Sequence, residues 1–307
     1  MKNNVHPQEN YTIGLVQMSI SANTEQNINK AIDRIRLATK KGAEVICLPE
    51  LFCSQYFCQS EDPAFFNLAE PIPGPTTKIF SAAAKKHRVA LIVPIFERRA
   101  SGVYHNSAAI IDADGSLIGV YRKMHIPDDP AYYEKYYFAP GDLGFQAFET
   151  TYGRIGTLIC WDQWYPEGAR ITSLLGASVL FFPTAIGWHP KEKTEHGCAQ
   201  RDSWQTVQRG HAIANGVYVA SVNRIGLEKP AANAAGIEFW GSSFIADPQG
   251  VILAEASVEK EEILIAEIDL HHQEDIRRNW PFLRDRRIDA YGGITQRFLT
   301  EEQWRKK

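Results

Sequence analysis

Residues 153–182 read GRIGTLICWDQWYPEGARITSLLGASVLFF and decide the class of fold. The apolar run at 154–160 predicts a strand, and 166–175 predicts a helix with proline near its first turn. Residues 179–182 predict a second buried strand. Because a helix separates two short buried runs, the sheet that contains them is expected to be largely covered. This stretch therefore predicts an α/β protein.

The same alternation continues outward from this stretch in both directions. Further strands are predicted at 11–18, 45–48, 89–96, 107–111, 117–121, 217–222, 243–246, 251–254 and 263–268. Further helices are predicted at 76–87, at 200–215, and between an N-cap at Asn23 and a C-terminal Gly42. Asp112-Ala113-Asp114-Gly115 is typical of a hairpin turn, so the predicted sheets are mixed rather than purely parallel.

Composition excludes several classes of protein. The chain has 307 residues, of which 44% are hydrophobic and 22% charged, as in a globular enzyme rather than a disordered or fibrous chain. The net charge of −3 gives no electrostatic footprint for nucleic acid or an anionic membrane. No apolar run approaches the roughly 20 residues of a membrane span. Residues 1–10, expected to be disordered or extended, lack the apolar core of a secretory signal.

Five cysteines at irregular spacing favour free thiols over a disulfide framework, so a cytoplasmic protein is expected. Cys53 and Cys58 lack a second pair that would complete a zinc site, and the pair His271-His272 is more typical of a helix start than of a metal site. We therefore expect no metal and no cofactor.

Three predicted strands are followed by reactive side chains. Glu50 follows Val-Ile-Cys-Leu-Pro, Lys123 follows Ile-Gly-Val-Tyr-Arg, and Cys160 follows Ile-Gly-Thr-Leu-Ile. Active sites of α/β proteins gather at strand ends, where side chains face a crevice. The helix that begins at Pro166 brings a positive end near the thiol, which favours the thiolate.

Each of these three residues alone has an ordinary structural explanation: an inert buried thiol, or a charged side chain that turns to solvent. Together they form a chemical set. A thiol nucleophile needs a base to take its proton and a fixed positive charge where the oxyanion develops. Cys160, Glu50 and Lys123 supply these three roles without histidine or metal.

The same residues resemble the motifs of the nitrilase superfamily of carbon–nitrogen hydrolases. The matching catalytic segments are LPELF at 48–52, YRKMHIP at 121–127 and LICWDQWYPE at 158–167, with supporting matches at 183–185, 211–215, 223–224 and 241–244. The resemblance covers residues 11–292. It implies a four-layer αββα sandwich with two mixed sheets in a single domain at 11–270, and a homo-oligomer built from αββα–αββα dimers. Residues 271–307 are then expected to form a C-terminal helix and tail at the oligomer interface.

By this resemblance Cys160 is the nucleophile, helped by the backbone N–H of Trp161, and Glu50 is the general base. Lys123 stabilises the tetrahedral intermediate. Glu134 stands where the family often places a second glutamate, which orients the lysine. The expected catalytic residues are therefore Glu50, Lys123, Glu134 and Cys160.

Within the superfamily, segments 123–130, 133–138 and 282–287 are most similar to the branch that acts on N-carbamoylputrescine. This resemblance implies hydrolysis to putrescine, ammonia and carbon dioxide through a thioester on cysteine, a step in polyamine biosynthesis. Plant-like members carry acidic residues after 183–187 that can face the substrate ammonium. This chain has Trp-His-Pro-Lys at 188–191 instead, with Glu192 and Glu195 nearby. The expected substrate-binding residues are Tyr56, Trp161, Thr184 and Glu192.

Two alternatives remain open at this stage. A related hydrolase acting on a carbamoyl amino acid or an ω-amide would need arginine for the substrate carboxylate, whereas a carbamoylated diamine needs an acid. An oligomeric scaffold without catalysis is the alternative from a different class. The intact set of Glu50, Lys123 and Cys160 argues against it.

Overall fold

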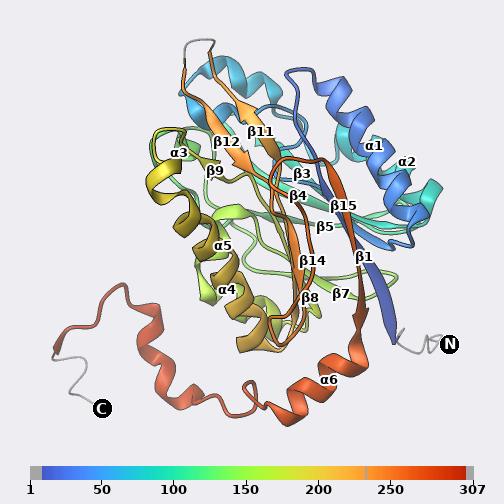
Figure 1. The fold of residues 1–307 in the computed structure, drawn as a ribbon, viewed down its shortest axis with the longest axis vertical. Coiled ribbons are helices and arrows are strands. Elements are labelled where there is room, and N and C mark those ends of the chain that lie inside the picture. The colour runs from blue at the N-terminus through green and yellow to red at the C-terminus, as the bar shows by residue number, and fades with distance from the viewer. Residues whose placement is uncertain (1–8, 232–233, 302–307) are drawn as a thin grey trace.

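Two six-stranded sheets face each other in the computed structural model, which describes residues 9–231 and 234–301 (Figure 1). The first sheet has the order β15-β1-β2-β3-β4-β5 and the second the order β14-β13-β10-β8-β7-β6. In each sheet three neighbouring strands run parallel and the flanking strands pair antiparallel, so both sheets are mixed as predicted.

The strands of the first sheet are β1 (Asn10–Gln17), β2 (Val45–Cys47), β3 (Ala90–Ala100), β4 (Val103–Ile111), β5 (Leu117–Arg122) and β15 (Glu262–Asp269). Those of the second are β6 (Ala147–Glu149), β7 (Arg154–Thr157), β8 (Val179–Pro183), β10 (Tyr218–Val222), β13 (Phe244–Ala246) and β14 (Ile252–Glu255). A smaller sheet has the order β11-β12-β9, formed by Ile225–Glu228, Ile237–Trp240 and Gly187–Trp188.

Helices cover the outer faces of the sandwich. Figure 1 shows α1 (Thr24–Lys40) and α2 (Pro75–His87) on one side, and α4 (Pro166–Leu174) and α5 (Lys193–Asn215) on the other. Each pair follows from βαβ connections that place a helix over the sheet it joins. The single-domain αββα architecture is therefore confirmed.

Alternation along the strands decides which side chains meet between the sheets. In β2, Val45 and Cys47 point to the inter-sheet core, whereas Ile46 packs with the residues beneath α1 and α2. A fully buried isoleucine or phenylalanine contributes about 1.5–3 kcal/mol through burial, so these two cores hold the layers at fixed spacing. Cys47 is thus a core residue.

The helix boundaries follow from local capping. The side chain of Asn23 accepts a hydrogen bond from the backbone N–H of Gln26 at 2.9 Å, as predicted for the start of α1. Asp269 caps α6 (Leu270–Asn279) through the N–H of His272 at 2.8 Å. The pair His271-His272 is therefore a helix start, as expected.

Several short elements were not predicted. The strands β6, β9, β11 and β12 are two to four residues long, too short for a recognisable period. The one-turn helix α3 (Glu134–Tyr137) lies between β5 and β6, where no helix was predicted. Helix α5 begins at Lys193 rather than at the predicted residue 200. The prediction missed its first two turns because they are mostly polar and exposed and carry no apolar stripe. Of the expected N-terminal segment at 1–10, residues 1–8 lie outside the described part of the chain.

Candidate active site

The ends of strands from both sheets bring the predicted catalytic side chains together. Lys123 follows β5, Glu50 follows β2 by three residues, and Glu134 opens α3. The Nζ of Lys123 donates to Oε1 of Glu50 at 2.8 Å and to Oε2 of Glu134 at 2.6 Å. All three side chains are essentially inaccessible to solvent. One ammonium group therefore joins two buried carboxylates.

This cluster fixes the charge of the lysine. Burial alone would lower the pKa of Lys123, but Glu134 and Glu50 raise it well above its usual value, so the side chain stays an ammonium. Burial raises the pKa of the Glu134 carboxyl, while Lys123 opposes the shift. A permanent positive charge beside a buried site is the requirement for stabilising an oxyanion.

Cys160 stands at the start of the 3-10 turn η3 (Cys160–Trp164), which follows β7. Its φ of 43° is left-handed, an unusual conformation for a non-glycine residue that turns the side chain out of the strand direction. Burial raises the pKa of the thiol well above its usual value, Glu50 raises it further, and Lys123 lowers it. Burial, the largest of these effects, favours the neutral thiol and opposes the thiolate expected from the helix end.

Glu50 keeps one oxygen available. Its Oε1 accepts from Lys123 and from Nδ2 of Asn106 at 2.7 Å. Its Oε2 is buried and has no hydrogen-bond partner among residues 9–231 and 234–301. A carboxylate held by one oxygen and unpaired at the other is suited to accept a proton.

Asp162 holds the nucleophile turn in place. Its Oδ2 accepts from the backbone N–H of Ile159 at 3.0 Å and from the hydroxyl of Tyr121 at 2.7 Å. Its Oδ1 accepts from the backbone N–H of His125 at 2.9 Å. The sequence analysis gave no role to Asp162 or Asn106. For Asp162 the available signal was an acidic residue two positions after the expected nucleophile.

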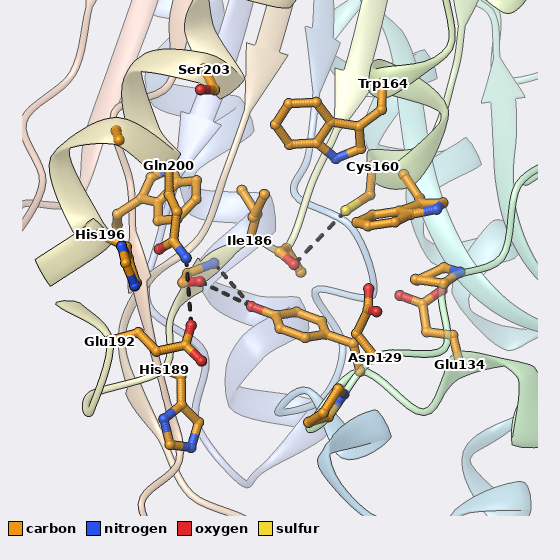
Figure 2. Close-up of a pocket in the computed structure, with 18 residues that line it drawn as sticks. Asp129, Glu134, Cys160, Trp164, Ile186, His189, Glu192, His196, Gln200 and Ser203 are labelled. Atoms are coloured by element: carbon orange, nitrogen blue, oxygen red, sulfur yellow. Dashed lines mark hydrogen bonds between the residues drawn. The ribbon is translucent and has the colours of Figure 1, made fainter.

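A cavity of about 820 Å³ opens above Cys160. Its lining includes Asp129, Tyr132, Glu134, Trp161, Trp164, His189, Glu192, His196 and Gln200. Figure 2 shows Glu192 across the cavity from Cys160, with Nε2 of Gln200 at 3.5 Å from its Oε2. Among the described residues that line this space there is no arginine or lysine. The far side of the cavity therefore carries carboxylate, amide and imidazole groups.

The structure brings only part of the expected substrate-binding set to the cavity. Trp161 and Glu192 line it. Tyr56 lies behind Glu134 and donates its hydroxyl to Oε1 of that residue at 2.7 Å. Thr184 is buried, and its hydroxyl bonds to Oε1 of Gln163 and to the carbonyl of Phe182. Neither Tyr56 nor Thr184 belongs to the lining, so direct substrate contact by these two has no support in this geometry.

Glu195, the other acid considered for the substrate ammonium, is not among the residues that line the cavity. Its side chain is 81% exposed and lies beside His196, outside the cavity lining. Of the two nearby glutamates, Glu192 alone reaches the cavity.

The described residues hold no group of three or more histidine, cysteine or acidic side chains arranged for a metal ion. Within the same ranges, none of the helices has the length and apolar character required to cross a membrane.

Comparison with known proteins places this chain beside one family, two relatives and one crystal structure. The carbon–nitrogen hydrolase family model matches residues 12–278. The chain is 45% identical to N-carbamoylputrescine amidase from Solanum lycopersicum, over 91% of this chain and 93% of that protein. It is 41% identical to citrullinase from Francisella tularensis, over 94% of this chain and 99% of that protein. The crystal structure of a carbon–nitrogen hydrolase from Helicobacter pylori G27 superimposes with a TM-score of 0.91 at 48% identity, covering 94% of this chain and all of the other.

Proposed function

Because this chain belongs to the carbon–nitrogen hydrolase family, we propose that it hydrolyses the ureido group of a carbamoylated alkylamine, with N-carbamoylputrescine as its substrate. The observation that carries the proposal is the cluster of Glu50, Lys123 and Glu134 beside a cavity whose lining includes Cys160. Family membership makes the protein an enzyme, which removes the alternative of a scaffold without catalysis.

In the first half-reaction, the sulfur of Cys160 attacks the ureido carbonyl carbon and Oε2 of Glu50 takes the thiol proton. Since the resting thiol is neutral, a base has to act during the attack. Lys123 and the backbone N–H of Trp161 stabilise the negative oxygen of the tetrahedral intermediate. When the carbon–nitrogen bond breaks, Glu50 returns the proton to the leaving nitrogen. Ammonia departs, and an S-carbamoyl thioester remains on Cys160.

The second half-reaction uses water. Glu50 takes one proton from the water as its oxygen attacks the thioester carbonyl, and the proton returns to the departing sulfur of Cys160. The product is an alkyl carbamic acid, which decomposes to the amine and carbon dioxide. The free thiol is regenerated, so no oxidant, reductant or cofactor enters the balance.

The choice of a diamine derivative rests on the far side of the cavity. N-carbamoylputrescine ends in an ammonium group, whereas citrulline carries the same ureido group together with an ammonium and a carboxylate. Glu192 and Asp129 line the cavity, and among its described lining residues there is no arginine or lysine to receive a carboxylate. Opposite charges favour the ammonium, and like charges disfavour the carboxylate by an amount that can reach several kcal/mol. The acidic lining therefore supports the diamine derivative over the amino acid.

Steady-state kinetics with ammonia release as the readout test this proposal. We expect the highest kcat/KM for N-carbamoylputrescine, with citrulline, N-carbamoyl-β-alanine and an ω-amide such as succinamate at least tenfold lower. A higher kcat/KM for citrulline would reassign the substrate to an amino acid. Cys160→Ala should lower kcat more than about 10⁴-fold with an intact fold. Cys198→Ala, which changes an exposed thiol on α5, is the matched control and should keep full activity.

We also propose that residues 280–301, the segment after α6, contact a second copy of this chain. Figure 1 shows this segment outside the outline of the sandwich. Its apolar side chains are exposed, with Ile288 at 74%, Ile294 at 65% and Phe298 at 84%. Exposed apolar groups gathered on one segment are typical of an interaction site.

Light scattering after size-exclusion chromatography tests the contact. The wild-type protein should be a dimer or larger, and the double variant Ile288→Asp, Ile294→Asp should have the mass of a smaller species. Ile79→Asp, a change at an exposed apolar residue of α2, is the control and should leave the mass unchanged. A monomeric wild type, or an unchanged mass of the double variant, would refute the contact.

The cellular location proposed for this enzyme is the cytoplasm. All five cysteines are free thiols, as suits a reducing compartment.

A further inference from the structure

Arg224 and Glu228 form an ion pair that lies beneath the catalytic cluster and is closed to solvent. Their side chains are 0% and 2% exposed. Nη1 of Arg224 donates to both carboxylate oxygens of Glu228, at 3.0 and 3.1 Å. Neither residue lines the cavity. Moving two charges out of water costs several kcal/mol per ion, so stability alone does not account for such a pair.

Arg224 also donates hydrogen bonds to the turn that carries Glu50. Nη2 donates to the carbonyl oxygens of Glu50 at 2.5 Å and Leu51 at 3.0 Å, and Nη1 donates to that of Ser54 at 3.2 Å. Leu51 has a φ of 48°, a left-handed conformation that costs a leucine about 1–3 kcal/mol. One guanidinium group thus donates hydrogen bonds to three carbonyl oxygens of a strained turn. The conformation of this turn sets the direction in which the Glu50 side chain leaves the backbone.

Glu228 reaches the second carboxylate of the cluster through Tyr56. The backbone N–H of Tyr56 donates to Oε2 of Glu228 at 2.6 Å. The hydroxyl of Tyr56 donates to Oε1 of Glu134 at 2.7 Å, and the other oxygen of Glu134 accepts from Lys123 at 2.6 Å. Every member of this chain of hydrogen bonds is buried. Glu228 therefore fixes Tyr56 at its backbone, and Tyr56 fixes Glu134 at its side chain.

We infer that Arg224 and Glu228 act as a positioning pair for the two carboxylates that flank Lys123. Arg224 orients Glu50 by binding its turn, and Glu228 orients Glu134 by binding Tyr56. The inference rests on the proposed function, in which Glu50 is the base and Lys123 holds the oxyanion. The physical reason is geometric: Lys123 can stabilise the intermediate and leave Oε2 of Glu50 available only if both carboxylates keep their places. A displacement of about 1 Å in an active site can cost about 100-fold in rate.

Two conservative substitutions test the pair. Glu228→Gln keeps the shape and an acceptor for Tyr56 but removes the charge that holds Arg224. Arg224→Lys keeps the charge, although one ammonium group cannot reach all the acceptors that a guanidinium reaches. We expect each variant to lower kcat roughly 10- to 100-fold. KM should stay within about threefold of the wild-type value, since neither residue lines the cavity.

A double-mutant cycle separates positioning from a general loss of structure. Tyr56→Phe removes only the hydroxyl that bonds Glu134. If Glu228 acts through Tyr56, the double variant Glu228→Gln, Tyr56→Phe should lose less in kcat than the product of the two single losses. A loss in kcat equal to the product of the two single losses would mean that Glu228 does not act through Tyr56.

Tyr11→Phe is the matched control for stability. It deletes a buried hydroxyl that bonds Oγ of Ser178 at 2.7 Å, away from the cavity lining. Thermal unfolding should show a lower Tm for this variant with an unchanged kcat. Folded Arg224→Lys and Glu228→Gln proteins with wild-type kcat would overturn the inference. Failure of both to fold would overturn it too, because the pair would then be structural only.

The kinetics should use whichever ureido or amide substrate the wild type turns over fastest, so a wrong substrate assignment does not decide the outcome. Full activity of Cys160→Ala would refute the proposed mechanism. An inactive Cys160→Ala together with wild-type kinetics of the Arg224 and Glu228 variants would refute only the positioning role.

Discussion

The hydroxyl of Tyr121 donates to Oδ2 of Asp162 at 2.7 Å, and this bond joins the two halves of the catalytic machinery. Tyr121 lies in β5 of the first sheet, two residues before Lys123. Asp162 lies two residues after Cys160 in η3, the turn that follows β7 of the second sheet. Both side chains are fully buried. Asp162 also accepts from the backbone N–H of His125, two residues after Lys123. The strand ends that carry the lysine and the nucleophile belong to different sheets and are thus held together by hydrogen bonds to Asp162 from both sides of Lys123.

Loss of this contact should reduce both stability and rate. We expect Tyr121→Phe to lower the free energy of unfolding by about 1–2 kcal/mol, because a buried charged acceptor loses a donor. Asp162→Asn should lower the free energy of unfolding by about 3 kcal/mol, because the four groups that donate to Asp162 are arranged around a carboxylate. Both variants should also lower kcat roughly tenfold or more. Urea unfolding and steady-state kinetics measure the two effects, and wild-type kcat in Asp162→Asn would argue against the coupling.

Glu50→Gln tests the base directly. An amide cannot accept the thiol proton, so kcat should fall about 10²- to 10⁴-fold with little change in KM. The fold should persist, because Lys123 keeps its bond to Glu134. Glu97→Gln is a suitable control, since Glu97 is also buried and paired, but with Arg122 and Ser107 rather than with Lys123. It should lose stability and keep kcat within about threefold, and an equal loss of kcat in both variants would contradict a special role for Glu50.

Glu192→Gln should weaken the binding of the substrate ammonium. We expect KM for N-carbamoylputrescine to rise about tenfold, which corresponds to about 1.4 kcal/mol, while kcat changes little. N-butylurea has the same ureido group without the ammonium, so its KM should be unaffected by the substitution. Glu195→Gln removes a neighbouring acid that does not line the cavity and serves as the matched control. The assignment fails if both substrates, or both variants, respond alike.

The pH dependence of kcat/KM distinguishes a neutral thiol from a thiolate. Burial raises the pKa of the Cys160 thiol well above its usual value, and Glu134 and Glu50 raise that of Lys123 against the effect of burial. Across the ordinary titration range of cysteine, near pH 8.5, the thiol stays protonated and the lysine charged. The rate with N-butylurea should therefore be flat between about pH 7.5 and 9.5. A rate that increased as the pH passed about 8.5 would indicate attack by a preformed thiolate.

Glu261 provides a stability test remote from the site. Burial opposes its ionisation, but the hydrogen bonds from Lys30 and Ser19 lower its pKa to about 2 from a usual 4.5. Because the folded-state pKa is lowered, the stabilisation is present above pH 4.5 and is lost as the pH falls toward 2.

Glu261→Gln should therefore lower the free energy of unfolding by about 2 kcal/mol at pH 7. The difference from the wild type should shrink as the pH falls from 4.5 toward 2. Glu274→Gln, which breaks an exposed pair with Arg278, should change stability by less than about 0.5 kcal/mol. Urea unfolding at a series of pH values checks both variants, and a difference for Glu261→Gln that did not depend on pH would contradict the assignment.

How much the sequence reveals differs between elements. The long strands and helices were predicted because their apolar residues recur with a clear period, as in α1 and β15. The short strands β9, β11 and β12 were not, since two to four residues carry no period. These strands matter for function, because Arg224 immediately precedes β11 and Glu228 ends it.

By itself the sequence determined the class of fold and the chemistry at three strand ends. Strand ends can be predicted from the sequence because the apolar run stops directly before the reactive side chain. This pattern involves only neighbouring residues. Only the tertiary structure decided that Lys123 joins Glu50 and Glu134, that Glu192 rather than Glu195 faces the cavity, and that the Cys160 thiol is neutral. These properties depend on burial and on contacts between residues 11 to 73 positions apart. Local propensity carries no information about either.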